Sequence, residues 1–426
     1  MGSLLLRRGT RPALLILMPL ATTDGPSPDG ASPEKNSRPH LGYLDSLRAL
    51  AALYVVIFHT NVQIDFYKPQ PAKLNAIQSK FVQLCSLGPY AVIFFIVLSG
   101  FCLMMPVIRN QGHLRGGLYT FFKRRAERIL PPYYLACLFS LAFIFTILSQ
   151  KTGKPWDVVL GVTWPDILTH LLVVHNISTA YSVKINPVFW SIAVEWQIYF
   201  LFPVLLFFWR RFGLGPMIVG ATALSCALSW ALQQRAWMWP NALNVHFVGL
   251  FVLGMAASVA SFSTSSRAYA LARRVSWAIA LPLATLLTGA VIFYAATHGW
   301  NRHVPLVLAT NLLAGAWSAL LLVSVSLRPQ GALRRALDWK PLVFVGTFSY
   351  SLYLIHAPLL QLIWQYGTSR LHLSRFNEFM LLLAVGLPMI VAASYFFFLL
   401  AERPFLRSRQ RRSVAATGTK GEVPAA

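Results

Sequence analysis

Ten long runs of mainly apolar residues constrain this chain more than any other feature of its sequence. A helix rises about 1.5 Å per residue, so about 20 apolar residues cross the roughly 30 Å hydrocarbon layer of a bilayer. Only 12% of the residues are charged and 56% are hydrophobic, which is unlike a soluble domain. We therefore predict an all-α integral membrane protein, a bundle of about ten transmembrane helices. The runs lie near residues 44–62, 89–108, 132–149, 188–209, 217–234, 243–262, 275–296, 305–327, 342–365 and 379–400.

The distribution of lysine and arginine predicts the orientation of these spans. If the N-terminus is cytoplasmic, 26 of the 37 basic residues lie in cytoplasmic segments, 10 lie in outside segments and the last is Arg48. Because positive loops resist translocation, we predict that both termini are cytoplasmic. The net charge of +24 then reflects topology, and no nucleic-acid partner is expected, because the basic residues form short clusters between apolar runs.

The chain divides into three predicted segments. Residues 1–40 are expected to be a disordered cytoplasmic lead, residues 41–405 the membrane domain, and residues 406–426 a basic, disordered cytoplasmic tail. A cleaved signal peptide is an alternative for the lead, because arginines precede the short apolar patch ALLILMPL. Cleavage would invert the charge asymmetry, which favours the cytoplasmic lead.

Two further features have simple interpretations. The apolar piece DILTHLLVVHNI, which begins at Asp166, is too short to cross a bilayer and is expected to lie at the interface or to re-enter. The four cysteines lie far apart and lack the spacing of a disulfide framework or a zinc site, so no metal site is predicted.

Polar residues inside the first span mark a candidate site. A charged side chain in hydrocarbon costs at least about 2.5–3.5 kcal/mol, so such residues are functional candidates. Arg48 and His59 differ by about 20° around the helix axis and about 16 Å along it, so they share one face at different depths. Asp45 lies three residues before Arg48 and can pair with it. Interfacial snorkelling of Arg48 and a purely structural role for His59 are the alternatives.

A second polar set lies in NPVFWSIAVEWQIYFLFP, where Ser191, Glu195 and Tyr199 recur every four residues on one helical face. By helical rise, Glu195 lies at a depth comparable with that of His59. We therefore predict that Glu195 orients the imidazole of His59 and raises its basicity.

Three more polar side chains lie at intermediate depth in other spans. Ser99 belongs to FFIVLSGF, and Tyr353 and His356 belong to GTFSYSLYLIHAP, where Ser349 begins an i, i+4, i+7 series. Small and hydroxyl side chains in spans often serve only helix packing. Convergence of these groups on one region is what makes them candidates.

A basic cluster precedes the third span in FFKRRAERILPPYY. Arg124, Arg125 and Arg128 fall on one helical face and follow Lys123. Positive anchors are common at cytoplasmic span ends, which is the simpler interpretation. The alternative is a site for a polyanion such as a nucleotide phosphate, because guanidinium groups match phosphate oxygens.

These motifs, in this order, resemble the acyltransferase-3 family of membrane-bound acyltransferases over about residues 41–405. The most specific element is an arginine and a histidine separated by ten residues in the first span. The matching elements here are Arg48 and His59, LSGF from Leu98 to Phe101, KRRAERILPPYY, the set Trp190, Ser191 and Glu195, the segment Ser349 to Pro358, and the Glu-x-Pro element Glu402 to Pro404.

The resemblance implies an O-acyltransferase with no bound cofactor. It would use acyl-CoA as co-substrate, with acetyl as the default acyl group, and a hydroxyl of a sugar, polysaccharide or related acceptor such as a macrolide. With about 25 residues after residue 401, the chain resembles the stand-alone form, without an extracellular hydrolase-like domain. The expected location is a multi-pass position in a membrane, the inner membrane in a bacterium.

Residue roles follow from the resemblance together with the chemistry. We expect Arg48, Arg124, Arg125 and Arg128 to bind acyl-CoA, and His59 to act as general base or as a covalent acyl carrier, both of which stay open. Glu195 would act with His59. The expected acceptor or oxyanion residues are Ser99, Tyr353 and His356.

Two other functions stay open on the sequence alone. A secondary transporter or lipid-linked glycan flippase would use Arg48, His59 and Glu195 as a proton relay. A non-catalytic membrane scaffold is the other alternative, although buried arginine, histidine and glutamate side chains are costly in such a role.

Overall fold

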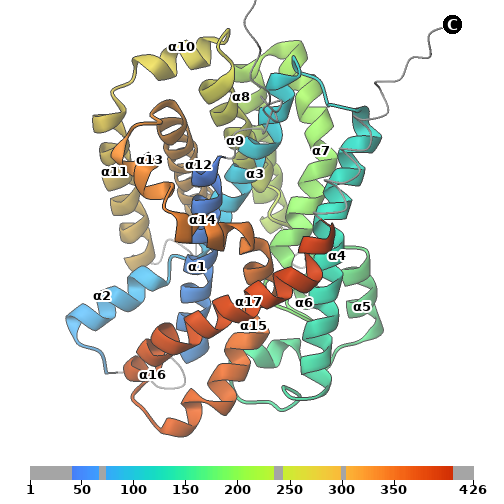
Figure 1. Ribbon diagram of the computed structural model, residues 1–426, viewed down its shortest axis with the longest axis vertical. Coiled ribbons are helices and arrows are strands. Elements are labelled where there is room, and N and C mark those ends of the chain that lie inside the picture. The colour runs from blue at the N-terminus through green and yellow to red at the C-terminus, as the bar shows by residue number, and fades with distance from the viewer. Residues whose placement is uncertain (1–40, 67–72, 235–242, 299–303, 406–426) are drawn as a thin grey trace, which may run out of the picture. The chain divides into compact units, whose positions relative to one another are not determined.

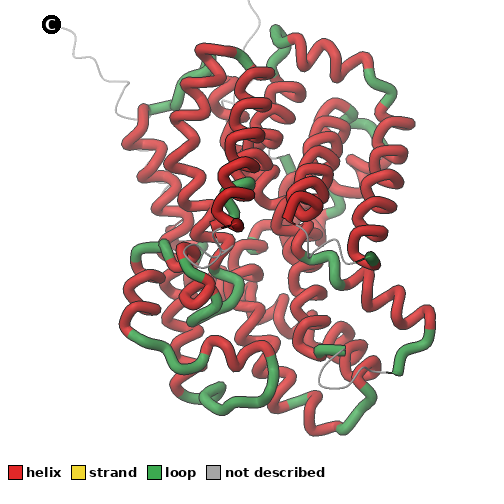
Figure 2. The backbone as a smooth tube through the Cα atoms, turned by 180° about the vertical axis from the view of Figure 1, so that it is seen from behind, coloured by secondary structure: helices red, strands yellow, loops and turns green. Residues whose placement is uncertain are grey.

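The computed structural model describes residues 41–66, 73–234, 243–298 and 304–405. Within these ranges the chain folds into helices and their connections, without a strand (Figure 2). The all-α prediction is therefore confirmed. The predicted lead, residues 1–40, and the predicted tail, residues 406–426, lie outside the described residues, and the orientation of the termini stays a prediction.

Eight helical stretches in the described part are long and apolar enough to cross a membrane, and two bent helix pairs bring the number of candidate spans up to 10. This confirms the prediction of about ten spans in an integral membrane protein. The spanning elements are α1 (Gly42–Ile64), α3 (Pro89–Arg109), α4 (Gly117–Phe145), α7 (Trp190–Phe212), α8 (Leu214–Gln234), α9 (Phe247–Phe262) with α10 (Arg267–Arg274), α11 (Trp277–Thr297), α12 (Val304–Leu327), α14 (Lys340–Thr347) with α15 (Ser349–Tyr366), and α16 (Arg375–Leu381) continuing into α17 (Leu387–Ala401).

Short elements connect these spans. In Figure 1, α10 lies at the top of the view, whereas α2 and α16 lie at the lower left. The apolar piece from Asp166 forms only short helices, which confirms that it is no span of its own. The connecting elements are α2 (Ala76–Cys85), η1 (Pro155–Val159), α5 (Trp164–Leu171), η2 (His175–Ile177), α6 (Thr179–Ser182), α13 (Ala332–Leu337), η5 (Thr368–Leu371) and a π-helical turn (Leu382–Gly386) before α17.

Two predicted spans differ in detail from the observed helices. Helix α4 begins at Gly117, about four turns before the predicted start, and continues through Pro131 and Pro132. The basic cluster therefore lies within the helix itself. A bend of 75° between α9 and α10 lies beyond the end of the predicted span 243–262. The predicted span 342–365 is broken at Phe348, where α14 and α15 meet at 72°. Hydropathy measures the length of an apolar run and carries no information about a bend within it.

Close backbone contact joins α3 to α9, which lie side by side in Figure 1. A Cβ atom added to Gly100 would lie 2.1 Å from the carbonyl oxygen of Phe251, and one added to Gly254 would lie 1.9 Å from that of Val97. Small residues allow such approach between membrane helices. The two glycines thus fix α3, which carries Ser99, against the bundle.

A similar contact places the bend between α14 and α15 beside the first helix. A Cβ atom added to Gly346 would lie 2.0 Å from the carbonyl oxygen of Asp45. The start of α15 is thereby held near the Asp45 and Arg48 end of α1. The bend therefore brings Ser349 and Tyr350 toward the polar residues of the first span.

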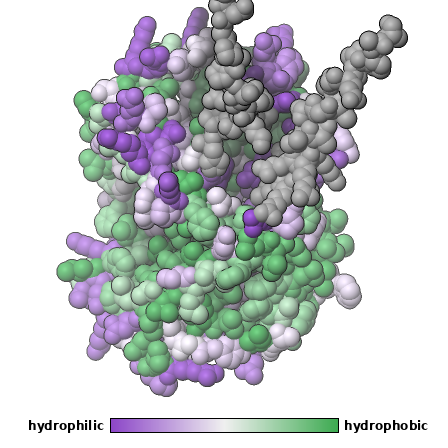
Figure 3. Space-filling view, viewed as in Figure 1, coloured by the Kyte–Doolittle hydropathy of each residue, from purple (hydrophilic) through white to green (hydrophobic). Residues whose placement is uncertain are grey.

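The outer surface of the bundle is apolar. On α11, Leu283, Leu286 and Leu287 are 60–71% exposed, the reverse of a soluble helix. Figure 3 shows a broad hydrophobic surface on one face, with hydrophilic residues gathered toward the top and along the lower edge. Meanwhile Ser258, Ser351 and His356 are fully buried. Apolar groups face outward and polar groups face inward, as a lipid solvent requires.

Candidate active site

A cavity of about 130 Å³ opens among α1, α3, α4, α7 and α15. Most of the polar residues singled out in the sequence meet there, although they come from five helices. Apolar side chains such as Phe95 and Ile192 form the rest of the wall. The polar lining consists of Arg48, Ser99, Cys102, Arg125, Arg128, Ser191, Glu195, Tyr199, Ser349, Tyr350 and Tyr353.

Glu195 is held by two hydroxyl groups. Ser99 donates a hydrogen bond of 2.7 Å to Oε1 of Glu195, and Tyr199 donates to the same oxygen. The hydroxyls of Ser99 and Tyr199 lie 3.0 Å apart. Since Glu195 and Tyr199 are one helical turn apart, the predicted common face of α7 is confirmed.

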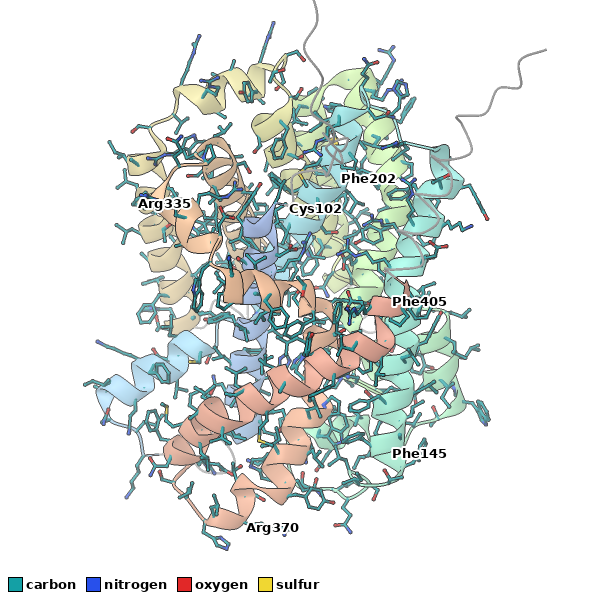
Figure 4. The ribbon with its side chains drawn as sticks, in the orientation of Figure 1. Cys102, Phe145, Phe202, Arg335, Arg370 and Phe405 are labelled. Carbon is teal, nitrogen blue, oxygen red and sulfur yellow. The ribbon has the colours of Figure 1, made fainter. Side chains whose placement is uncertain are left out.

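Arg48 is paired on its own helix, as predicted. Its Nη1 donates to Oδ1 of Asp45 at 2.6 Å, and its Nη2 donates to Sγ of Cys102 at 3.1 Å. Figure 4 shows Cys102 on α3, next to α1. The two contacts hold the guanidinium at the edge of the cavity, so Arg48 does not simply extend to the membrane surface.

The basic cluster of α4 divides into two groups. Arg125 and Arg128 line the cavity, whereas Arg124 is not part of its lining. With Arg48, three guanidinium groups and the single carboxylate of Glu195 face the same space, which makes the lining positive. Such an array suits a polyanion. The prediction that all three arginines of α4 act together is therefore restricted to Arg125 and Arg128.

Tyr353 marks the other side of the cavity. Its hydroxyl lies 2.6 Å from Oγ of Ser191 and 3.2 Å from the carbonyl oxygen of Val188. Its ring lies edge-on to that of Phe95, with 6.0 Å between centroids. One turn further along α15 is His356, whose ring centroid lies 5.8 Å from that of Tyr353.

His59 lies beside His356 and is not in the cavity lining. Its Nδ1 is 2.9 Å from the carbonyl oxygen of Val55 and 3.2 Å from Nε2 of His356. The predicted pairing of Glu195 with His59 is therefore wrong, because Glu195 is bonded to Ser99 and Tyr199 and His59 to a second histidine. Equal depth by helical rise does not ensure contact, since α1 and α7 place these two side chains in different surroundings.

Cys102 and Tyr350 also line the cavity and had no role in the sequence interpretation. Cys102 lies three residues after Ser99, on the same face of α3. This spacing could have identified Cys102 from the sequence as a neighbour of the predicted site. Tyr350 lies just after the bend at Phe348, and its hydroxyl donates to the carbonyl oxygen of Ile129 at 3.1 Å. No sequence signal marked that bend. Among the described residues, no group of three or more His, Cys, Asp or Glu side chains could hold a metal ion.

Comparison with known proteins gives a family match over most of the chain. Residues 41–399 match a family model described as an acyltransferase domain. No solved structure matches the chain. The family model thus covers all five helices that line the cavity, including α1 and α15, which carry His59 and His356.

Curated relatives are distant but extensive. The chain is 24% identical to the peptidoglycan O-acetyltransferase OatA of Listeria monocytogenes over 85% of its length and 56% of that protein. It is 23% identical to the O-acetyltransferase OatA of Staphylococcus aureus over 77% and 52%, and 24% identical to the putative peptidoglycan O-acetyltransferase YrhL of Bacillus subtilis over 75% and 48%. The chain therefore spans about half the length of the curated relatives it matches.

Proposed function

Because this chain belongs to the family of acyltransferase domains, we propose that it transfers an acyl group, acetyl by default, from acyl-CoA to a hydroxyl group of a cell-envelope polysaccharide. The names of the relatives, which describe O-acetylation of peptidoglycan, support a polysaccharide acceptor over a small molecule such as a macrolide. The membrane bundle supports an acceptor presented at a membrane.

The positive cavity is the observation that carries the proposal. Acyl-CoA has a phosphate-rich nucleotide end and a thioester at the tip of a long, flexible arm. Arg48, Arg125 and Arg128 lie on two helices around one cavity, so they can hold several phosphate oxygens at once. A transporter or flippase would not need to bind a thioester donor, and membership of an acyltransferase family argues against that alternative.

His59 is the base in the proposed reaction. Its imidazole takes the proton of the acceptor hydroxyl as that oxygen attacks the thioester carbonyl carbon. The C–S bond then breaks, the acyl group stays on the acceptor oxygen as an ester, and the CoA thiolate takes the proton back from His59. In an acyl-histidine relay, Nε2 of His59 would instead attack the thioester carbon as a nucleophile and release the CoA thiolate. The acceptor hydroxyl would then take the acyl group from Nε2, and its proton would end on the thiolate.

The donor must reach beyond the cavity for this chemistry. Tyr353 lines the cavity and packs against His356, which contacts His59. The thioester arm would therefore extend past Tyr353 while the phosphates stay at the arginines. Glu195 would act from the cavity, where it fixes the hydroxyls of Ser99 and Tyr199 and balances part of the positive charge before the donor binds.

Product identification tests the proposal. Membranes that contain the protein are incubated with isotope-labelled acetyl-CoA and peptidoglycan fragments, and the products are separated and identified by mass spectrometry. We expect protein-dependent loss of the thioester and label in an alkali-labile ester on the glycan. Uptake or release of glycan without consumption of acetyl-CoA would support a transporter and contradict the proposal.

A further inference from the structure

The contact between His59 and His356 joins two histidines that are 297 positions apart in the sequence. Their ring centroids lie 4.9 Å apart with the planes tilted by 57°. His356 is fully buried, whereas His59 is partly buried. In a hydrogen bond between two imidazoles, one ring nitrogen must carry the hydrogen and the other must offer a lone pair.

The backbone around His356 fixes the position of its proton. Nδ1 of His356 lies 2.8 Å from the carbonyl oxygen of Tyr353 and 3.2 Å from that of Leu352. A carbonyl oxygen only accepts hydrogen bonds, so Nδ1 must carry the hydrogen. A neutral imidazole has one N–H group, so Nε2 of His356 has a lone pair, and this is the atom that faces His59.

The same reasoning fixes the proton of His59. Its Nδ1 faces two acceptors, the carbonyl oxygen of Val55 at 2.9 Å and the lone pair of His356 Nε2 at 3.2 Å. Nδ1 of His59 must therefore be the N–H group. Its Nε2 then carries the lone pair, which is the atom that a general base uses.

We propose that His356 is a positioning residue that holds His59 in the Nδ1–H tautomer and orients its basic Nε2 toward the acceptor hydroxyl. This inference rests on the proposed function and deepens it. Both ring nitrogens of His356 are engaged within the protein, so His356 supports His59 and does not line the acceptor site, as the sequence had suggested. It takes the place that a carboxylate occupies beside the histidine of a hydrolase triad.

The pair also stabilises the charged intermediate. When Nε2 of His59 accepts the hydroxyl proton, His59 becomes an imidazolium and its Nδ1–H becomes a stronger donor to Nε2 of His356. Because His356 stays neutral, the site holds one positive charge and not an ion pair. The proton returns from Nε2 of His59 to the leaving thiolate, and no net proton passes through His356.

Two substitutions separate positioning from other roles. His356→Leu removes the acceptor that faces His59, whereas His356→Gln offers a side-chain oxygen in its place. We expect His356→Leu to lower kcat at least about tenfold, and by no more than the roughly 10²–10⁴-fold that a general base contributes. The KM values for acetyl-CoA and the glycan should stay within about twofold of wild type. His356→Gln should recover part of kcat. Thermal stability is measured for each variant.

Other outcomes contradict this role. A raised KM for the glycan with kcat unchanged would return His356 to the acceptor site. If His356→Leu and His356→Gln lose kcat equally, and if each loss matches a loss of thermal stability, His356 would have a purely structural role. If the wild-type protein shows no detectable acetyl transfer, the proposed function itself is contradicted. Failure of the proposed function is therefore distinguishable from failure of the role proposed for His356.

The wild-type protein provides a test that does not depend on activity. The ¹⁵N resonances of His59 are identified in histidine-labelled protein by comparison with His59→Gln. We expect a protonated Nδ1 and a bare Nε2. A proton on Nε2 of His59 in the neutral protein would overturn the inference.

Discussion

Ser99 donates a hydrogen bond of 2.7 Å to the carboxylate of Glu195 and thereby joins α3 to α7 across the cavity. Tyr199 donates to the same oxygen from one turn further along α7. Loss of that oxygen would leave one of the two hydroxyl donors without an acceptor, because the hydroxyls of Ser99 and Tyr199, 3.0 Å apart, can then bond only to each other. An unsatisfied buried polar group costs about 1–3 kcal/mol.

The identity of the side chain at position 195 should therefore affect stability through its acceptor oxygen. We expect Glu195→Ala to lower the thermal midpoint in detergent clearly more than Glu195→Gln, because the amide oxygen of Gln can still accept from Ser99 and Tyr199. Thermal unfolding monitored by intrinsic fluorescence measures both. Equal midpoints for the Ala and Gln variants would contradict the hydrogen-bond arrangement.

The arginines of α4 should differ in their effect on donor binding. Arg125 and Arg128 line the cavity and Arg124 does not. We expect Arg125→Gln with Arg128→Gln to raise the KM for acetyl-CoA at least about tenfold, since a hydrogen bond to a charged group contributes about 1.5–3 kcal/mol. Arg124→Gln is the matched control and should leave this KM within about twofold. The same rise in the control would contradict the division of the cluster, and an unchanged KM in the Arg125 and Arg128 variant would assign those residues to membrane anchoring.

Gly254 should tolerate no side chain. A Cβ atom at this position would lie 1.9 Å from the carbonyl oxygen of Val97, whereas nothing lies within 4 Å of one at Gly289 on α11. We expect Gly254→Ala to destabilise the bundle by roughly 1–3 kcal/mol, the cost of overpacking, and Gly289→Ala to be neutral or stabilising because alanine favours a helix. Thermal midpoints and the yield of monodisperse protein measure the effect. Similar results for the two substitutions would contradict the close packing of α3 on α9.

Acid should destabilise the connection between α4 and α7 through His175. Burial lowers the pKa of His175 to about 3 from its usual 6.5, and the ring of His170, stacked at 4.0 Å between centroids, adds to the shift. Between pH 6.5 and pH 3, His175 is therefore protonated in the unfolded chain but neutral in the folded chain. The stability that depends on neutral His175 is complete above pH 6.5 and falls as the pH drops from 6.5 toward 3.

This pH dependence is measurable as the thermal midpoint between pH 7.5 and pH 4 in detergent. We expect the thermal midpoint of the wild-type protein to fall below pH 6.5. The corresponding loss in free energy of unfolding is up to about 1.4 kcal/mol per pH unit for one group. His175→Gln should reduce that loss. An identical decline in the variant would assign the acid sensitivity to other groups.

Local patterns in the sequence predicted much of the fold and the nearest contacts. Hydropathy located the spans, because a bilayer requires long apolar helices whatever their tertiary arrangement. The pairing of Asp45 with Arg48 and the common face of Glu195 and Tyr199 were also predictable, since residues three or four apart on a helix are neighbours.

Contacts between distant helices were not predictable in this way. His59 and His356 are 297 positions apart, and Ser99 and Glu195 are 96 positions apart. Helical periodicity shows which face a residue occupies but does not show which helix lies against that face. The error in pairing Glu195 with His59 has this cause, and the bend at Phe348, which positions Tyr350, left no mark in an uninterrupted apolar run.

The most direct test of the account is acetyl transfer by His59→Ala compared with wild type. Both proteins are inserted in membranes at equal amounts, with equal thermal stability verified, and labelled glycan ester is measured against time with saturating acetyl-CoA. We expect the variant to lose at least about 10²-fold in rate, the lower end of what a general base contributes. Transfer by His59→Ala at the wild-type rate would contradict the assignment of the chemistry to the first span.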